Sequence, residues 1–127
     1  MEGVTFQFYI GDTYSRYFTI ENYQSEISEV YFSVKKSFND EKTVLQKTLE
    51  DGITLTEETY DESGNIKSRT YNLTIEATDT ETMKPEKEYP FDIEIVTPTN
   101  GIPIKNTIIS GTVVLTNATT RYYNEKE

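Results

Sequence analysis

The sequence of 127 residues contains no cysteine, no histidine and no tryptophan. Without cysteine, the chain can form neither disulfides nor thiolate zinc sites, and it has no thiol nucleophile. Without histidine, it lacks the most common general base and the most common transition-metal ligand. No apolar run is long enough for a membrane-spanning helix, and the first residues have neither the basic nor the hydrophobic part of a signal peptide. We therefore expect no membrane partner and no secretion signal within these residues.

Basic residues are also scarce, and the net charge is −10. Binding to nucleic acid requires clustered lysine and arginine, whereas the longest basic cluster here is Lys35-Lys36. We therefore expect no nucleic-acid partner. Residues 50–94 contain 13 acids and only 4 bases. This segment indicates either a solvated face that keeps the protein soluble or an acidic surface that selects a basic partner.

Short motifs give no catalytic or cofactor site. Residues 61–65, Asp-Glu-Ser-Gly-Asn, are similar to a calcium loop but lack its alternating ligands, so a hairpin tip fits them better. A glycoside hydrolase needs two facing carboxylates, whereas the acids here lie mainly at expected turns or on the polar side of expected strands. The glycines have no phosphate-binding spacing. We expect no enzymatic activity, no cofactor and no metal ion.

Apolar and polar residues alternate with a period of two along most of the chain, as in half-buried antiparallel strands. The clearest segments are 4–10, 30–34, 71–75, 89–95 and 113–115, and weaker ones are 14–20, 43–49, 53–57 and 104–109. Turn residues such as Asp51-Gly52 and Asn100-Gly101 separate them. This pattern predicts an all-β antiparallel sandwich of about seven to nine strands.

Three local features refine this prediction. One helical turn is expected at 79–83, with Asp79 as its N-cap, and Gly111 suggests a bulge or a break between two strands. Residues 1–121 should form a single domain, and residues 122–127 a flexible acidic tail. The expected core comprises Phe6, Phe8, Phe18, Val30, Phe32, Val34, Leu73, Ile75, Phe91, Ile93, Val113 and Leu115.

Tyr89 indicates an immunoglobulin-like form of this sandwich. It follows a short turn and precedes the inward position Phe91 by two residues, as the corner tyrosine of immunoglobulin-like domains precedes a core cysteine. We expect its ring to be buried and its hydroxyl to bond the backbone near residues 83–86.

Partner contacts are predicted from the aromatic residues, because tyrosine gives a large contact area at a small entropic cost. The alternative is that most of these rings cover the faces of the sandwich. The stretches 4–10 and 116–123 carry little charge, as the centres of interfaces do. The candidate contact residues are Phe6, Phe8, Tyr9, Tyr14, Tyr17, Tyr122 and Tyr123.

The order of several short motifs resembles one protein family over nearly the whole chain. An opening strand leads into Gly11-Asp12-Thr13, the stretch 71–75 precedes Asp79-Thr80, and residues 89–93 read Tyr-Pro-Phe-Asp-Ile. A last hairpin carries Gly-Thr-Val-Val-Leu at 111–115. This arrangement resembles the immunoglobulin-like N-terminal domain of tailed-bacteriophage baseplate upper proteins and its single-domain relatives.

The resemblance implies a non-catalytic structural protein of a phage particle. It would be made in the cytoplasm of the bacterial host and would act in the virion, in the tail or baseplate rather than the capsid. Its partners would be other virion proteins, in a multi-copy or homo-oligomeric assembly that it joins as an adaptor or decoration subunit. The competing hypothesis is a bacterial surface or secreted immunoglobulin-like module that binds carbohydrate or protein.

Overall fold

The computed structural model describes residues 4–37, 39, 41–81, 83–85 and 87–116, and over them the chain is all-β with one short helix. The expected tail at 122–127 lies outside the described residues. In chain order the elements are β1 (Val4–Tyr9), β2 (Tyr14–Glu21), β3 (Glu29–Lys35), β4 (Thr43–Leu49), β5 (Gly52–Tyr60), β6 (Ile66–Ile75), α1 (Ala77–Thr80), β7 (Glu88–Thr97) and β8 (Ile104–Thr116).

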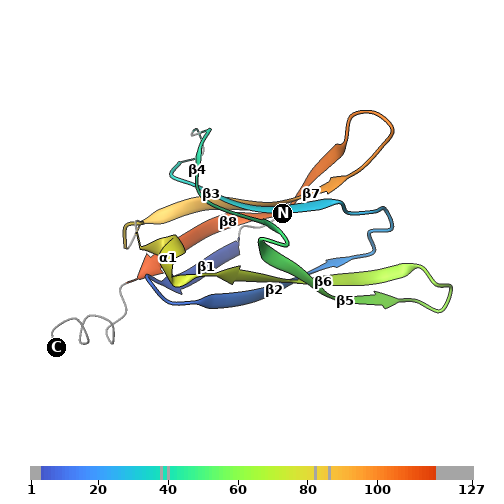
Figure 1. Cartoon of the computed structure of the whole chain (residues 1–127), viewed down its shortest axis with the longest axis horizontal. Helices are drawn as coiled ribbons and strands as arrows, with labels where there is room; N and C mark the ends of the chain where they lie inside the picture. Colours follow the sequence, from blue (N-terminus) through green and yellow to red (C-terminus); the bar gives the residue numbers. More distant parts are fainter. Residues whose placement is uncertain (1–3, 38, 40, 82, 86, 117–127) are drawn as a thin grey trace.

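All eight strands belong to one mixed sheet in the order β1-β8-β7-β3-β4-β5-β6-β2, which curls into a nearly closed, barrel-like form (Figure 1). The pairs β1–β8 and β4–β5 are parallel, and the other pairs are antiparallel. The prediction of an all-β fold with seven to nine strands is confirmed. Its finer form, a wholly antiparallel sandwich of two separate sheets, is not confirmed, because a two-residue pairing of β4 with β5 joins all strands into one sheet.

The core lies inside this curled sheet and consists of the apolar side of each alternating strand. Eleven of the twelve predicted core residues are buried; the exception is Phe6, which is partly buried and stacks on Phe91 with 4.7 Å between ring centroids. Tyrosines are part of the core as well, since Tyr71 stacks on Phe18 at 5.4 Å. Period-two alternation therefore identified the inward faces correctly.

The strands at the two ends of the sheet, β1 and β2, meet through side chains. The rings of Phe8 and Tyr14 pack edge to face at 4.8 Å across this seam. The helix contributes there too, because the hydroxyl of buried Thr80 accepts a hydrogen bond of 2.8 Å from the backbone N–H of Gly11. A single helical turn is present, but it spans Ala77–Thr80 and not 79–83, and the prediction that Asp79 is its N-cap is wrong. Glu76 is the N-cap, and the Asp79 carboxylate accepts its backbone N–H at 2.7 Å.

Gly111 lies within the continuous strand β8, so the prediction of a bulge or strand break at this residue is wrong. The register shift between β7 and β8 falls instead between Ile93 and Glu94. Gly111 has a different role, because it is the register partner of Val4 in the parallel β1–β8 pair. A Cβ atom at residue 111 would lie only 1.8 Å from the carbonyl oxygen of Val4. The glycine therefore provides the room in which β1 packs.

Tyr89 has the environment expected of it. Its ring is buried, and its hydroxyl accepts a hydrogen bond of 2.9 Å from the backbone N–H of Lys84, five residues upstream. The bond connects the start of β7 to the segment that follows α1.

Replacement of Tyr89 by phenylalanine should remove this bond and leave the ring in place. We expect the free energy of unfolding to fall by about 1 kcal/mol, the usual net contribution of one hydrogen bond. Urea denaturation monitored by circular dichroism measures this change. Tyr17→Phe is the matched control, because the Tyr17 side chain is 68% exposed, and it should be close to neutral. Equal stability of the two variants would contradict this role for the Tyr89 hydroxyl.

Candidate functional site

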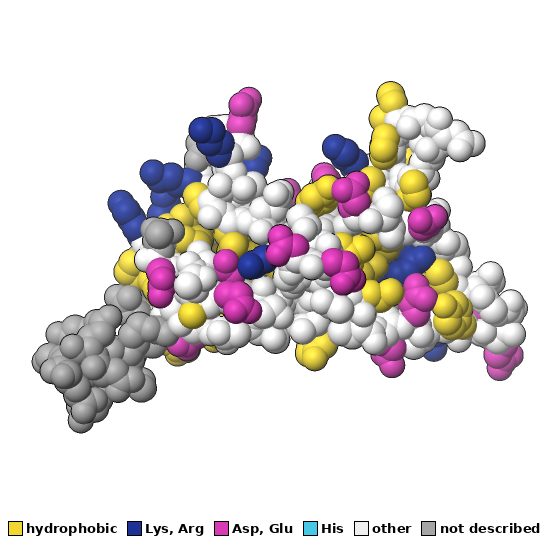
Figure 2. Space-filling model, viewed as in Figure 1, with side chains coloured by type: hydrophobic (Ala, Val, Ile, Leu, Met, Phe, Trp, Pro, Cys, Tyr) yellow, Lys and Arg dark blue, Asp and Glu magenta, His cyan; other side chains and the backbone are white. Residues whose placement is uncertain are grey.

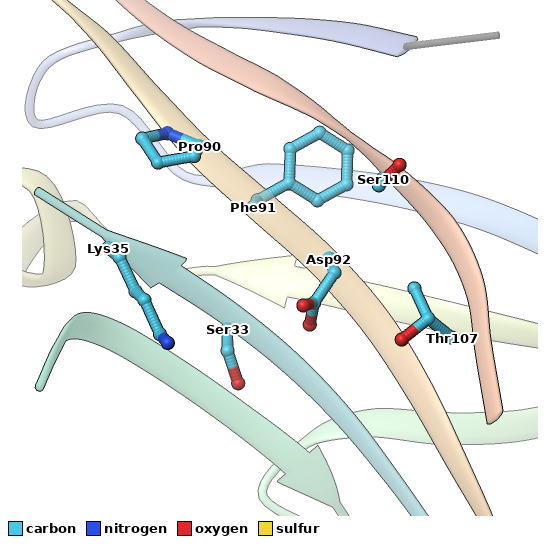
Figure 3. Close-up of a pocket in the computed structure, with 7 residues that line it drawn as sticks. All are labelled: Ser33, Lys35, Pro90, Phe91, Asp92, Thr107 and Ser110. Carbon is cyan, nitrogen blue, oxygen red and sulfur yellow. The ribbon is translucent and has the colours of Figure 1, made fainter. Parts of the chain in front are cut away.

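A polar groove lies on the outer face of β3, β4 and β7. It forms because Val30, Phe32 and Val34 point into the core, so the residues between them on β3 point outward. The groove has a volume of about 370 Å³, and a second hollow of about 150 Å³ adjoins it (Figure 3). Both are lined by Ser33, Lys35 and Asp92; the larger groove is also lined by Glu29, Tyr31, Glu41, Thr43, Gln46, Glu94, Val96 and Lys105.

The register of the strands sets the electrostatics of the groove. Tyr31 lies opposite Glu94, and Ser33 lies opposite Asp92. The hydroxyl of Tyr31 donates a hydrogen bond to the Glu29 carboxylate. This bond, with desolvation and the negative charges of Glu29 and Glu94, raises the pKa of Tyr31 above its ordinary value, so the phenol stays protonated. Four carboxylates against two lysines give the groove an acidic character.

The side chains of the groove can bind a polar ligand. Its hydroxyl, amide and carboxylate groups can donate and accept hydrogen bonds; for example, the Gln46 amide donates to the Ser33 hydroxyl at 3.0 Å. Among the residues that the structure describes, no three acidic side chains are placed to hold a metal ion. Over the same residues, no helix is long and apolar enough to cross a membrane.

The predicted contact residues do not form one surface. Phe8 is only 1% exposed and belongs to the core, so its ring is not available to a partner, contrary to the prediction. Phe6 and Tyr14 are partly buried and pack against the core. Tyr9 and Tyr17 are exposed. Tyr122 and Tyr123 lie outside the described residues.

The sequence analysis overlooked the tip of the β7–β8 hairpin. Ile102 is 89% exposed, more than any other large apolar side chain in the described part of the chain, and Ile104 is also exposed. The tip projects from the body of the molecule, where Figure 2 shows apolar side chains on its surface. Its backbone is organised by Thr99, whose hydroxyl donates to the Ile102 carbonyl at 2.8 Å and accepts the Gly101 N–H at 3.2 Å. The available signal was Ile102-Pro103-Ile104 directly after a turn, where polar residues are usual.

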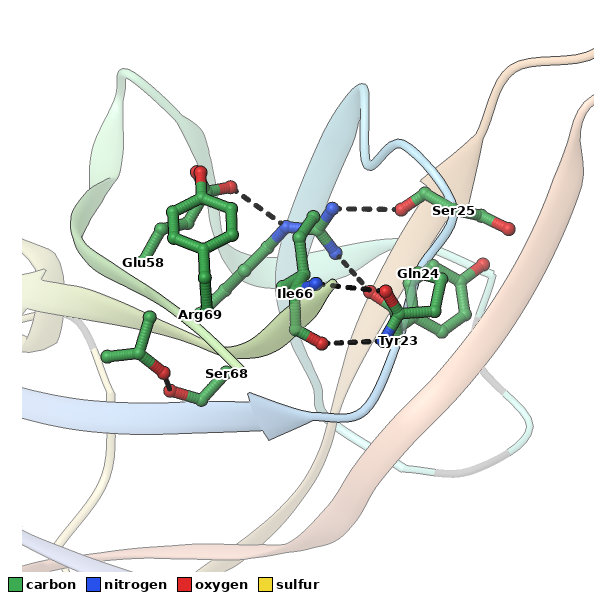
Figure 4. A network of polar contacts seen from close by, with 9 residues as sticks. Tyr23, Gln24, Ser25, Glu58, Ile66, Ser68 and Arg69 are labelled. Carbon is green, nitrogen blue, oxygen red and sulfur yellow. Dashed lines mark hydrogen bonds and ion pairs between the residues drawn. The ribbon is translucent and has the colours of Figure 1, made fainter. Parts of the chain in front are cut away.

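A buried arginine organises the loop beside this hairpin (Figure 4). Arg69 is 5% exposed, and its guanidinium donates to the backbone carbonyls of Tyr23 and Ser25, each at 3.0 Å. It also forms an ion pair of 3.2 Å with Glu58. Tyr23 in turn bonds the hydroxyl of Thr97 at the base of the hairpin. Arg69 therefore fixes the β2–β3 loop to β6, and the Tyr23 hydroxyl connects this loop to β7.

Glu58 completes this network at the surface. Hydrogen bonds from the Tyr60 hydroxyl and from Arg69 lower the pKa of the Glu58 carboxyl. Because the Glu58 pKa is lower in the folded chain than in the unfolded chain, this interaction stabilises the fold at pH values above the pKa of the unfolded chain. The stabilisation is lost as the pH falls through the folded pKa.

No protein-family model matches this chain, and no curated protein is significantly similar to it.

Proposed function

We propose that this chain is a non-catalytic structural protein of a tailed-bacteriophage particle, a tail or baseplate subunit that acts through protein–protein contacts. The sequence motifs that resemble the phage family support a role in a phage particle. The observation that carries the contact role is the projecting β7–β8 tip with its exposed Ile102 and Ile104. Exposed apolar side chains gathered at one place are typical of sites that bind another protein.

The immunoglobulin-like form of the fold is part of this proposal. The strands β1, β8, β7, β3 and β4 make one half of the sheet, and β5, β6 and β2 make the other. Within the described part of the chain, only two register pairs, Thr48 with Gly52 and Leu49 with Ile53, join the halves. Two such halves facing each other across a core, together with the bond from Lys84 to Tyr89, support an immunoglobulin-like sandwich.

The proposed partners are other virion proteins, in an assembly that contains several copies of this subunit. The proposed location is the virion, after synthesis in the bacterial cytoplasm. The excess of acidic residues supports a protein partner over nucleic acid, because phosphate groups would be repelled.

Mass spectrometry of purified particles tests this proposal. We expect the chain in the particles, and we expect Ile102→Asp to lower its incorporation while Lys67→Ala, an exposed change on β6 outside the tip, leaves it unchanged. Deletion of residues 1–10 is unsuitable as a test, since it removes Phe8 from the core. Absence of the unmodified chain from every particle would show that the proposed function is wrong.

The acidic groove favours a second candidate function, an immunoglobulin-like surface or secreted module that binds carbohydrate or protein. Tyr31, Gln46 and Asp92 offer an aromatic ring and polar groups in one concave surface. A glycan array separates the two candidates. Specific glycan binding that is lost in Asp92→Ala would favour the module, whereas the virion subunit should bind no glycan.

A further inference from the structure

The tip of the β7–β8 hairpin contains Asn100-Gly101, the only place in the sequence where glycine follows asparagine. Residues 98–103 form the loop beyond the last register pair of the hairpin, Thr97 with Ile104, and each of them is exposed (Figure 1). Among the described residues, no backbone–backbone hydrogen bond holds this loop. The Asn100 side chain and the Gly101 backbone are therefore both accessible to water.

Glycine leaves the backbone nitrogen of residue 101 unhindered. Asparagine loses its amide when the backbone nitrogen of the following residue attacks the side-chain carbonyl carbon. Gly101 has no Cβ atom to obstruct this attack, and a Cβ atom placed there would meet nothing within 4 Å, so its surroundings are open as well. The Gly101 N–H donates to the Thr99 hydroxyl at 3.2 Å, the long limit for such a bond. The attacking nitrogen is therefore held only weakly.

We propose that Asn100 is a site of spontaneous deamidation in the unassembled subunit, and that the product disables the β7–β8 tip as a contact surface. The Gly101 nitrogen gives up its proton to water and bonds to Cγ of Asn100. The C–N bond of the side-chain amide breaks, and its nitrogen takes up a proton and leaves as ammonia. Water then adds to the cyclic imide that remains. Opening of one C–N bond of the imide gives aspartate, and opening of the other gives isoaspartate, in which the backbone runs through the side chain.

Either product changes the charge of the tip. Residues 97–104 contain no charged side chain, so a carboxylate at residue 100 is the only charge among them. It lies two residues from Ile102, the exposed apolar side chain that carries the proposed contact. Covering an unpaired carboxylate with a partner surface is strongly unfavourable. This loss of contact rests on the proposed function, whereas the deamidation itself does not.

Isoaspartate also changes the backbone of the tip. It lengthens the chain between residues 100 and 101 by a carbon atom. The Thr99 hydroxyl accepts the Gly101 N–H and donates to the Ile102 carbonyl, and both of these groups lie beyond the added atom. The two hydrogen bonds cannot both keep their geometry, so the conformation that presents Ile102 is lost.

Asn65 is a matched comparison within the same chain, because it is also exposed at a hairpin turn, between β5 and β6. The residue after it is the β-branched Ile66, whose N–H donates to the Gln24 side chain at 2.9 Å. The N–H and the carbonyl of Asn65 are themselves both bonded to Asp61. The nitrogen that would attack Asn65 is thus hindered and bonded, and we expect Asn65 to keep its amide.

Peptide mapping by mass spectrometry tests the site on the purified full chain, sampled during incubation at mildly alkaline pH. We expect Asn100 to convert about tenfold faster than Asn65, whose following residue is β-branched. Gly101→Ala is the matched variant, because the open surroundings of residue 101 accept a methyl group without a clash, and it should slow the conversion of Asn100 about tenfold. Equal rates at Asn100 and Asn65, or in Gly101→Ala and the wild-type chain, would overturn the proposed site.

The effect on the contact is measured by incorporation into particles. Asn100→Asp carries the charge of the product, and Asn100→Gln keeps a neutral amide of similar polarity. We expect incorporation of Asn100→Asp to fall about tenfold, because a covered carboxylate is unfavourable, and that of Asn100→Gln to equal the wild-type level. Equal incorporation of the two variants would refute the effect on the contact. Absence of the wild-type chain from every particle would refute the proposed function, whereas conversion of Asn100 in the purified chain is decided without it.

Discussion

Replacement of Gly111 by alanine is expected to displace strand β1 from the sheet. The added Cβ atom would lie 1.8 Å from the carbonyl oxygen and 2.6 Å from the amide nitrogen of Val4. Both are backbone atoms, so no side-chain rotation relieves the clash. Since β1 carries Phe8 into the core, its displacement also disturbs packing. We expect the free energy of unfolding to fall by about 3 kcal/mol, the upper end of the usual cost of overpacking.

Urea denaturation measures this loss, and amide hydrogen exchange over residues 4–9 shows whether β1 is the strand affected. Gly101→Ala is the matched control, because a Cβ atom there would meet nothing within 4 Å. It should be neutral or slightly stabilising, since alanine restricts the unfolded chain more than glycine does. If Gly111→Ala unfolds like Gly101→Ala and keeps its exchange protection at 4–9, the close packing of β1 on β8 is wrong.

The role of Gly111 shows what alternation in the sequence can and cannot predict. Period-two alternation indicates which side chains share a face of a strand, and it correctly placed Val30, Phe32 and Val34 in the core. It contains no information on the direction of the neighbouring strand, since parallel and antiparallel strands alternate alike. The parallel pairing of β1 with β8 was therefore not predictable from these residues. The close approach that requires glycine at residue 111 follows from that pairing.

The candidate contacts failed for a different reason. Phe8 and Tyr9 are neighbours of similar aromatic character, and Phe8 was chosen as a contact residue for that character although alternation placed it in the expected core, where it is buried. The opposite error concerns Ile102, which was overlooked because apolar residues were assigned to the core. An apolar residue in a turn does not belong to a strand whose alternation would direct it into the core. The position of Ile102 directly after Asn100-Gly101 could therefore have predicted its exposure.

Arg69 was also overlooked, although its position follows from the alternation of β6. The inward residues Ile75, Leu73 and Tyr71 continue to residue 69 at the same spacing, which places an arginine on the core side of the strand. A buried guanidinium is stable only when its donors are satisfied. Here the backbone of the β2–β3 loop and the Glu58 carboxylate satisfy them.

Replacement of Arg69 by alanine should therefore destabilise the fold strongly. The change leaves the carbonyl groups of Tyr23 and Ser25 without their Arg69 donors and removes the cationic partner of Glu58. We expect a loss of about 3 kcal/mol in the free energy of unfolding, the lower end of the cost of breaking a buried ion pair. The lower end applies because the Glu58 side chain is 30% exposed and water can solvate it.

Two further variants separate geometry from charge. Arg69→Lys retains the positive charge, but its donors are on a single nitrogen and cannot reach all three acceptors that Nε, Nη1 and Nη2 of Arg69 bind, so it should recover only part of the stability. Lys67→Ala removes an exposed charge two residues earlier on the same strand and should cost less than about 0.5 kcal/mol. Denaturation curves of the three variants decide between the causes. A fully stable Arg69→Lys protein would mean that charge alone matters, and an Arg69→Ala protein as stable as Lys67→Ala would show that the guanidinium does not hold the β2–β3 loop.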